Sequence, residues 1–209
     1  MTAKRTLAVV SAGLSQPSST RLLADRLRDA AVARLEQDGY EVRTTSIELR
    51  DLAQDITNNL LTGFPSPRLS EAIEAMTAAD GVIAVTPIFS SSYSGLFKSF
   101  FDVVEPTALT GVPVVLGATG GSARHSLALE YAVRPLFAYL RAVTVPTAVF
   151  AASEDWGTGD AQLGALPARI DRAAGELSAL VAASDRSGRL NDPFALDRPF
   201  SELLGGRGA

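Results

Sequence analysis

Short apolar runs alternate with helical patterns along most of the chain, and this alternation limits the possible folds more than any other feature. The runs lie at residues 7–10, 41–47, 81–86, 112–118 and 143–151. Such alternation is typical of βαβ units, whose parallel strands form one sheet. Most of the runs are almost continuously apolar, as expected for strands that helices cover on both faces. The sequence therefore predicts an α/β fold with five parallel strands.

The remaining patterns predict an edge strand and the helices between the strands. Residues 41–47 are more polar than the other runs, which favours an edge of the sheet. Leu23, Leu27, Ala31 and Leu35 share one helix face, and Gly39 is expected to end that helix. Further helices are predicted at 49–61, 96–104, 126–140 with a kink at Pro135, and 163–181, and residues 62–67 are expected to form a loop that could cover a pocket.

Length and composition indicate one folded domain. The chain has 209 residues, of which 46% are hydrophobic and 20% charged, as in ordinary globular proteins. We expect one domain over residues 1–183. A tail at 184–209 has few core-forming side chains and is expected to be ordered only if it packs on another surface.

Charge and residue content exclude several functions. The net charge of −4 argues against nucleic acid as a partner. The absence of cysteine and the single histidine, His125, leave no cysteine chemistry and no His-rich metal site. Two uncharged stretches, residues 81–97 and 106–123, are broken by proline or glycine and do not resemble membrane spans. No membrane partner is expected, and the expected location is cytoplasmic.

The segment after the first predicted strand could bind a phosphate. Residues 11–20 contain five hydroxyl side chains and lead directly into a helix, whose N-terminus offers unpaired N–H groups and partial positive charge. A simpler interpretation is that Ser18 or Ser19 only caps the helix. The G-x-G-x-x-G and P-loop motifs are absent from this loop, so a monophosphate such as that of FMN is favoured.

Two further loops follow the third and fourth predicted strands, where ligands bind in open parallel sheets. Phe89 and Tyr93 offer flat apolar surface for a planar ring, or alternatively a turn with core aromatics. Gly120 and Gly121 would leave backbone N–H groups accessible to a ring edge, or simply form a tight turn. His125 could equally begin a helix and bond locally.

The second and third loops together resemble the NAD(P)H-dependent FMN reductases with the flavodoxin-like fold, in the branch similar to alkanesulfonate-system reductases. The matching residues are Thr86, Pro87, Phe89, Tyr93, Ser94, Gly95, Lys98, Gly120, Gly121, Ser122, His125, Leu129, Tyr131, Ala132, Arg134 and Pro135. The resemblance implies a five-stranded parallel sheet in the order 2-1-3-4-5, with helices on both faces.

The same resemblance implies an FMN site built from all three loops. The phosphate would lie on Ser11, Ser15, Ser18, Ser19 and Thr20, and the ribityl chain and ring would border Pro87, Ile88, Phe89, Ser90 and Tyr93. The edge of the isoalloxazine would meet Thr119, Gly120, Gly121 and Ser122, with His125 nearby. Two departures from relatives stand out: residues 11–20 contain no basic side chain, which suggests FMN that leaves readily, and Phe89 replaces a frequent tyrosine.

The function implied is transfer of hydride from NAD(P)H to FMN, with release of reduced flavin to a luciferase-like monooxygenase. The flavin carries out the chemistry, so no acid–base residue is assigned. Alternatives are a quinone or azo reductase, an electron carrier with permanently bound FMN, and a partner-binding module that has lost the flavin site. Relatives of this kind are commonly oligomers, and a homo-oligomer is expected. The preference between NADPH and NADH stays open.

Overall fold

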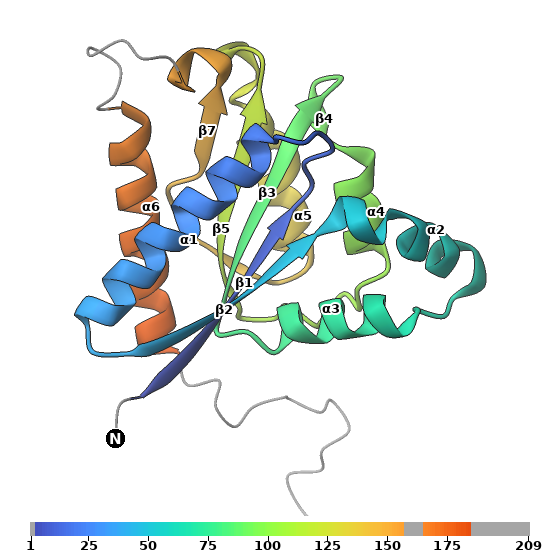
Figure 1. The fold of residues 1–209 in the computed structure, drawn as a ribbon, viewed down its shortest axis with the longest axis horizontal. Coiled ribbons are helices and arrows are strands. Elements are labelled where there is room, and N and C mark those ends of the chain that lie inside the picture. Colours follow the sequence, from blue (N-terminus) through green and yellow to red (C-terminus); the bar gives the residue numbers. More distant parts are fainter. Residues whose placement is uncertain (1–2, 157–164, 185–209) are drawn as a thin grey trace, which may run out of the picture.

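The computed structural model describes residues 3–156 and 165–184 of the chain, and its centre is a twisted sheet (Figure 1). The strands are β1 (Lys4–Ser11), β2 (Glu41–Glu48), β3 (Gly81–Phe89), β4 (Ser92–Tyr93), β5 (Pro113–Gly120), β6 (Val143–Thr144) and β7 (Val149–Ala152). The main path runs β2-β1-β3-β5-β6, while β4 pairs with β3 and β7 with β5. All pairings are parallel except the one between β3 and β4.

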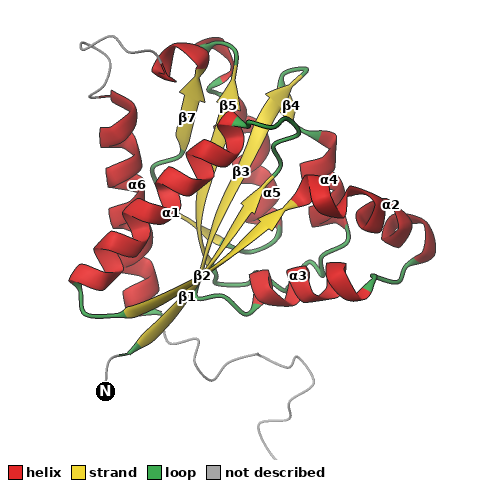
Figure 2. Ribbon diagram, in the orientation of Figure 1, coloured by secondary structure: helices red, strands yellow, loops and turns green. Residues whose placement is uncertain are grey.

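Helices cover both faces of this sheet (Figure 2). The α-helices are α1 (Ser19–Gln37), α2 (Ala53–Thr62), α3 (Pro67–Thr77), α4 (Gly95–Asp102), α5 (Arg134–Tyr139) and α6 (Ala165–Ala183). α1 and α6 pack on one face, and the other helices pack on the opposite face and around its edge. This arrangement confirms the predicted α/β flavodoxin-like fold with a parallel sheet between two helical layers.

Two separate cores hold the layers together. On the face of α1 and α6, side chains such as Leu23 and Leu27 pack against Leu7 and Val9 of β1. On the other face, the rings of Phe97 and Phe101 in α4 lie 4.8 Å apart, and Phe137 of α5 lies 4.9 Å from Phe101. These phenylalanines are almost fully buried within the chain, so they belong to its own core.

The predicted number of five strands is wrong, because the described residues form a sheet of seven. The predicted last strand, at residues 143–151, is divided in two by Pro146, which has no N–H to donate to β5. The backbone N–H of Thr147 instead donates to the Glu176 carboxylate at 2.8 Å. At the end of β3 a two-residue turn folds the chain back into β4, which the apolar pattern did not predict.

The helices also differ from the sequence predictions in two places. The region expected as one helix at residues 126–140 is a π-helical turn, η3 (Leu129–Val133), followed by α5. Pro135 lies in the first turn of α5, directly after η3, so the change from π-helix to α-helix falls next to this proline, and the kink expected there stays a prediction. α3 was not predicted; Ser66 caps it, accepting a hydrogen bond from Leu69 N at 3.2 Å, and Pro67 begins it.

Several other predictions hold. β2 ends the main path of the sheet, as expected from its polar sequence, and Gly39 follows the end of α1 with a positive φ of 86°. Residue 163, the predicted start of the last helix, lies outside the described residues, as does the predicted tail apart from Ser184. Within the described part of the chain, no helix combines the length and the apolar character that crossing a bilayer requires.

The turn between β3 and β4 yields a stability prediction. Ser90 and Ser91 both have positive φ, 48° and 70°, in a hairpin turn that favours glycine or asparagine. We expect Ser91→Gly to raise the free energy of unfolding by about 1 kcal/mol, because it removes the clash of an L side chain in the left-handed region. Denaturant titration measures this change. The control Ser92→Gly, within β4, should lower stability, and equal effects of the two substitutions would contradict the prediction.

Candidate active site

A cavity of about 480 Å³ lies at the carboxyl ends of β1, β3, β5 and β7. This is where the chain order reverses, because β1 is followed by β2 on one side and by β3 on the other. The lining residues are Leu14, Ser15, Ser18, Ser19, Thr20, Pro87, Ile88, Phe89, Thr119, Gly120, Gly121, Ser153 and Trp156. The three predicted loops therefore meet in one cavity, and its size is typical of small-molecule sites.

The loop after β1 brings hydroxyl groups to the N-terminus of α1. Ser18 is the N-cap, and its Oγ accepts a hydrogen bond from Arg21 N at 3.2 Å. Capping thus occupies one serine, while Ser15 and Ser19 are exposed to the cavity region. Gly13 permits this geometry, since a Cβ there would come within 2.1 Å of Ser18 Oγ. The first turn of α1 directs its positive end at the cavity.

A buried hydrogen bond joins the first and third loops below the cavity. The hydroxyl oxygens of Thr20 and Thr119 lie 2.8 Å apart, and both side chains are almost fully buried. The two residues are 99 positions apart in sequence. The bond therefore fixes the start of α1 relative to the end of β5, and with it the width of the cavity at this point.

The second loop is held by Thr86. Its Oγ1 donates to the carbonyl of Pro87 at 2.9 Å and accepts from Ser94 N at 3.1 Å, so the hairpin is bonded to the end of β3. Pro87 and Ile88 then form part of the cavity wall. The Phe89 ring, which also lines the cavity, is 50% exposed and leaves a flat apolar surface open to a ligand.

The third loop offers backbone to the cavity. A Cβ on Gly120 would lie 2.9 Å from Cζ of Phe150, so only glycine fits there without movement. A Cβ on Gly121 would meet nothing within 4 Å, which leaves open space beside this residue. A ligand can therefore approach the backbone of both glycines closely, as their sequence suggested.

Five of the predicted site residues do not line the cavity. They are Ser11, Ser90, Tyr93, Ser122 and His125. Ser11 is fully buried, and its hydroxyl has no hydrogen-bond partner among the described residues. Ser90 is exposed in the hairpin turn, Tyr93 packs against the core, and Ser122 Oγ accepts from Arg124 N at 3.3 Å. The His125 side chain is exposed, and the backbone N–H of this residue donates to Ser122 O at 3.3 Å.

Sequence reasoning missed Leu14, Ser153 and Trp156. The last two belong to a short helix, η4 (Ser153–Trp156), directly after β7. The Arg26 guanidinium lies over the Trp156 ring, 4.9 Å from its centroid. Extending the search for carboxyl-end loops to the last strand would have found this wall, since the chain's single tryptophan follows that strand.

The lining combines a hydroxyl-rich end with apolar walls, and none of the described residues in it has an ionisable side chain. At the hydroxyl end, serine and threonine side chains and the α1 N-terminus suit an anion such as a phosphate. At the other end Pro87, Ile88 and Phe89 suit a flat ring. Such a site can position a cofactor and its partner, but it supplies no acid, base or nucleophile of its own.

A second cavity of about 410 Å³ lies apart from the three loops, between β2 and α3. Its lining includes Glu48, Asp51, Arg68 and Glu71. The loop at residues 62–67, expected to cover a pocket, lines neither cavity. That expectation is therefore wrong for both, and the Phe64 side chain within the loop is exposed.

Comparisons with known proteins agree with this arrangement. A family profile described as NADPH-dependent FMN reductase matches residues 5–157. The FMN reductase (NADPH) of Pseudomonas aeruginosa is 34% identical over 174 residues, covering 83% of this chain and 91% of that protein. The NADH-dependent FMN reductase SfnF of Pseudomonas putida is 39% identical over 147 residues, covering 70% and 76%. The X-ray structure of an oxidoreductase from Corynebacterium diphtheriae has a TM-score of 0.84 at 48% identity, covering 88% of this chain and 100% of that one.

The bond beneath the cavity yields a second prediction. Thr20→Val should lower the free energy of unfolding by about 1–3 kcal/mol, because it leaves the buried Thr119 hydroxyl without its partner. Ser11→Ala is the matched control: it also removes a buried hydroxyl, but one that has no partner among the described residues, so stability should stay equal or rise. Denaturant titration of both variants measures the contrast. A larger loss in Ser11→Ala would contradict this account.

Proposed function

The chain belongs to the NADPH-dependent FMN reductase family, and on this premise we propose that the cavity at the carboxyl ends of β1, β3, β5 and β7 is its FMN site. The family gives the activity, which is transfer of hydride from NAD(P)H to FMN. The single observation that supports this location best is the meeting of a hydroxyl-rich helix N-terminus with an apolar wall in one cavity.

The residues divide by the part of FMN that they would hold. Ser15, Ser18, Ser19 and Thr20 would bind the phosphate, aided by the positive end of α1. Pro87, Ile88 and Phe89 would border the ribityl chain and the ring. Thr119, Gly120 and Gly121 would meet the ring edge through their backbone, and Ser153 and Trp156 would complete the opposite wall.

When bound, FMN supplies the chemistry by accepting hydride at N5 of its ring. The chain's own contribution is to bind the phosphate, orient the ring and leave one ring face open to the nicotinamide. Leu14 and Phe89, each about half exposed, flank that opening. We assign no acid–base residue, since the lining residues that the structure describes have no ionisable side chain.

Reduced FMN, we propose further, is released to a luciferase-like monooxygenase. Two observations support release: none of the described lining residues is charged, and the lining includes the exposed apolar side chains of Leu14 and Phe89. The resemblance of the motifs to alkanesulfonate-system reductases supports the partner. One domain over residues 1–183, a homo-oligomeric state and a cytoplasmic location stay predictions. Both NADPH and NADH are candidates, since relatives named for each are similar to this chain.

The activity and the phosphate assignment are tested together. Purified protein should oxidise NAD(P)H only when flavin is added. Ser15→Ala should raise the KM for FMN about tenfold, because a hydrogen bond to a charged group contributes about 1.5–3 kcal/mol. The KM for riboflavin, which has no phosphate, should not change, and this makes riboflavin the internal control.

Two results would count against the proposal. If NAD(P)H is not consumed with added FMN, the activity assigned here is wrong. If Ser15→Ala raises the KM for FMN and riboflavin equally, the hydroxyl does not act on the phosphate. Thr45→Ala, at an exposed position on β2 outside the flavin cavity, is a control variant that should behave as the wild type.

A further inference from the structure

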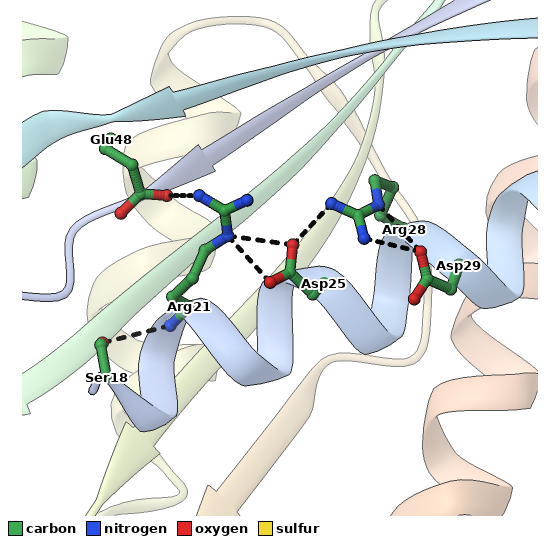
Figure 3. Close-up of polar contacts among 6 residues, drawn as sticks. All are labelled: Ser18, Arg21, Asp25, Arg28, Asp29 and Glu48. Atoms are coloured by element: carbon green, nitrogen blue, oxygen red, sulfur yellow. Dashed lines mark hydrogen bonds and ion pairs between the residues drawn. The ribbon is translucent and has the colours of Figure 1, made fainter. Parts of the chain in front are cut away.

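Arg21 is the first basic residue after the hydroxyl-rich loop, yet its guanidinium is turned away from the flavin cavity. It lies in the first turn of α1, and its side chain is absent from the cavity lining. Figure 3 shows the guanidinium between two carboxylates, Glu48 at the end of β2 and Asp25 on α1. Its Nη1 donates to Glu48 at 2.5 Å, and its Nε donates to both oxygens of Asp25 at 2.9 Å.

The position of this ion cluster brings it next to the phosphate end of the flavin cavity. A neighbouring cavity of about 360 Å³ is lined by Ser15, Ser18, Arg21, Asp25 and Glu48, among others. Ser15 and Ser18 also line the flavin cavity. The two serines thus separate the flavin cavity from the guanidinium, which lies on their far side.

The ion pairs of Arg21 are partly shielded from water. The side chains of Arg21, Asp25 and Glu48 are 34%, 29% and 21% exposed. Burial lowers the pKa of the guanidinium, but hydrogen bonds to Asp25 and Glu48 outweigh it, so the pKa is raised above its ordinary value. Asp25 also binds Arg28 at 2.6 Å, and Arg28 binds Asp29, which continues the cluster along α1.

An arginine in the first turn of a helix is unfavourable by itself, because the helix N-terminus is already positive. The first turn of α1 contains no acidic residue to offset this charge. Glu48 supplies one of the two balancing carboxylates from a different element, β2. A guanidinium released near the phosphate end of the flavin cavity would be attracted to a phosphate. Charge-assisted hydrogen bonds to phosphate are among the strongest in proteins.

We propose that Glu48 and Asp25 hold the Arg21 guanidinium away from the phosphate end of the flavin cavity, and thereby keep FMN affinity low enough for release. This inference rests on the proposed function. The two carboxylates are positioning residues: they act through Arg21 and do not touch FMN. By keeping the guanidinium paired, they favour dissociation of FMN from the flavin cavity over its retention.

The test measures the dissociation constant of FMN in the absence of NAD(P)H. Quenching of tryptophan emission reports binding, because Trp156 is the single tryptophan and lines the flavin cavity. Glu48→Gln should tighten FMN binding about threefold to tenfold, and the Asp25→Asn/Glu48→Gln double variant should tighten it further. Circular dichroism checks that each variant is folded.

Asp51→Asn is the matched control. Asp51 lines the same neighbouring cavity as Glu48, but its ion pair is with Arg50, at 3.5 Å. Removing this carboxylate takes away the same charge from the same cavity and leaves both partners of Arg21 in place. FMN affinity should therefore stay within about twofold of the wild type, and tightening equal to that of Glu48→Gln would overturn the proposal.

Variants built on Arg21→Gln test whether the Arg21 guanidinium is the group that tightens FMN binding. With Arg21→Gln present, adding Glu48→Gln should no longer tighten FMN binding, since no guanidinium is left to release. Persistence of the full effect there, or no tightening by Glu48→Gln alone, would also overturn the inference. Failure of the proposed function gives a different result: the wild-type protein would then show no saturable quenching by FMN.

Discussion

The parallel pairing of β1 with β3 and of β3 with β5 is the constraint on which the site depends. In this register Ser11 lies opposite Val85 and Pro87 opposite Thr119, so the carboxyl ends of the three strands lie at the same end of the sheet. Because the chain leaves β1 toward β2 and β3 lies on the other side, the loops diverge and leave a hollow between them. The two apolar cores fix the helices that follow each loop, and so fix the loops themselves.

Most of the fold and much of the site could be predicted from the sequence, because continuous apolar runs and carboxyl-end loops are local signals. Thr20, Phe89 and Gly120 line the cavity that the three loops were expected to form. The β3–β4 hairpin was not predictable in this way, because two serines occupy a turn that usually contains glycine. Trp156 was missed because only the loops after the first, third and fourth predicted strands were considered, whereas this residue follows the last strand. His125 differs from these residues: its exposed side chain does not line the cavity, and its position near the ring edge stays a prediction from the motif.

The side chains that would bind the flavin are distinct from the charged side chains that lie beside its cavity. Among the described residues, hydroxyls, backbone and apolar surface line the flavin cavity, whereas the charged side chains of Arg21, Asp25 and Glu48 line the neighbouring cavity and pair with one another. Arg50 takes part in this division as well, donating to the Leu14 carbonyl at 3.2 Å from outside the flavin cavity. Recognition by dipoles and shape gives orientation without the strong attraction of a fixed positive charge, which suits a flavin that is both bound and given up.

Among the described residues β2 pairs only with β1, and its unpaired edge has a consequence for behaviour at high concentration. An unpaired strand edge is a template for adding a strand from another molecule. Here the exposed Glu41 and Arg43 lie on that strand, and Glu41 forms ion pairs with both Lys4 and Arg43. A foreign strand would have to strip water from these charges in order to pair. The polar side chains that predicted an edge position for β2 therefore also disfavour edge-to-edge aggregation of the protein.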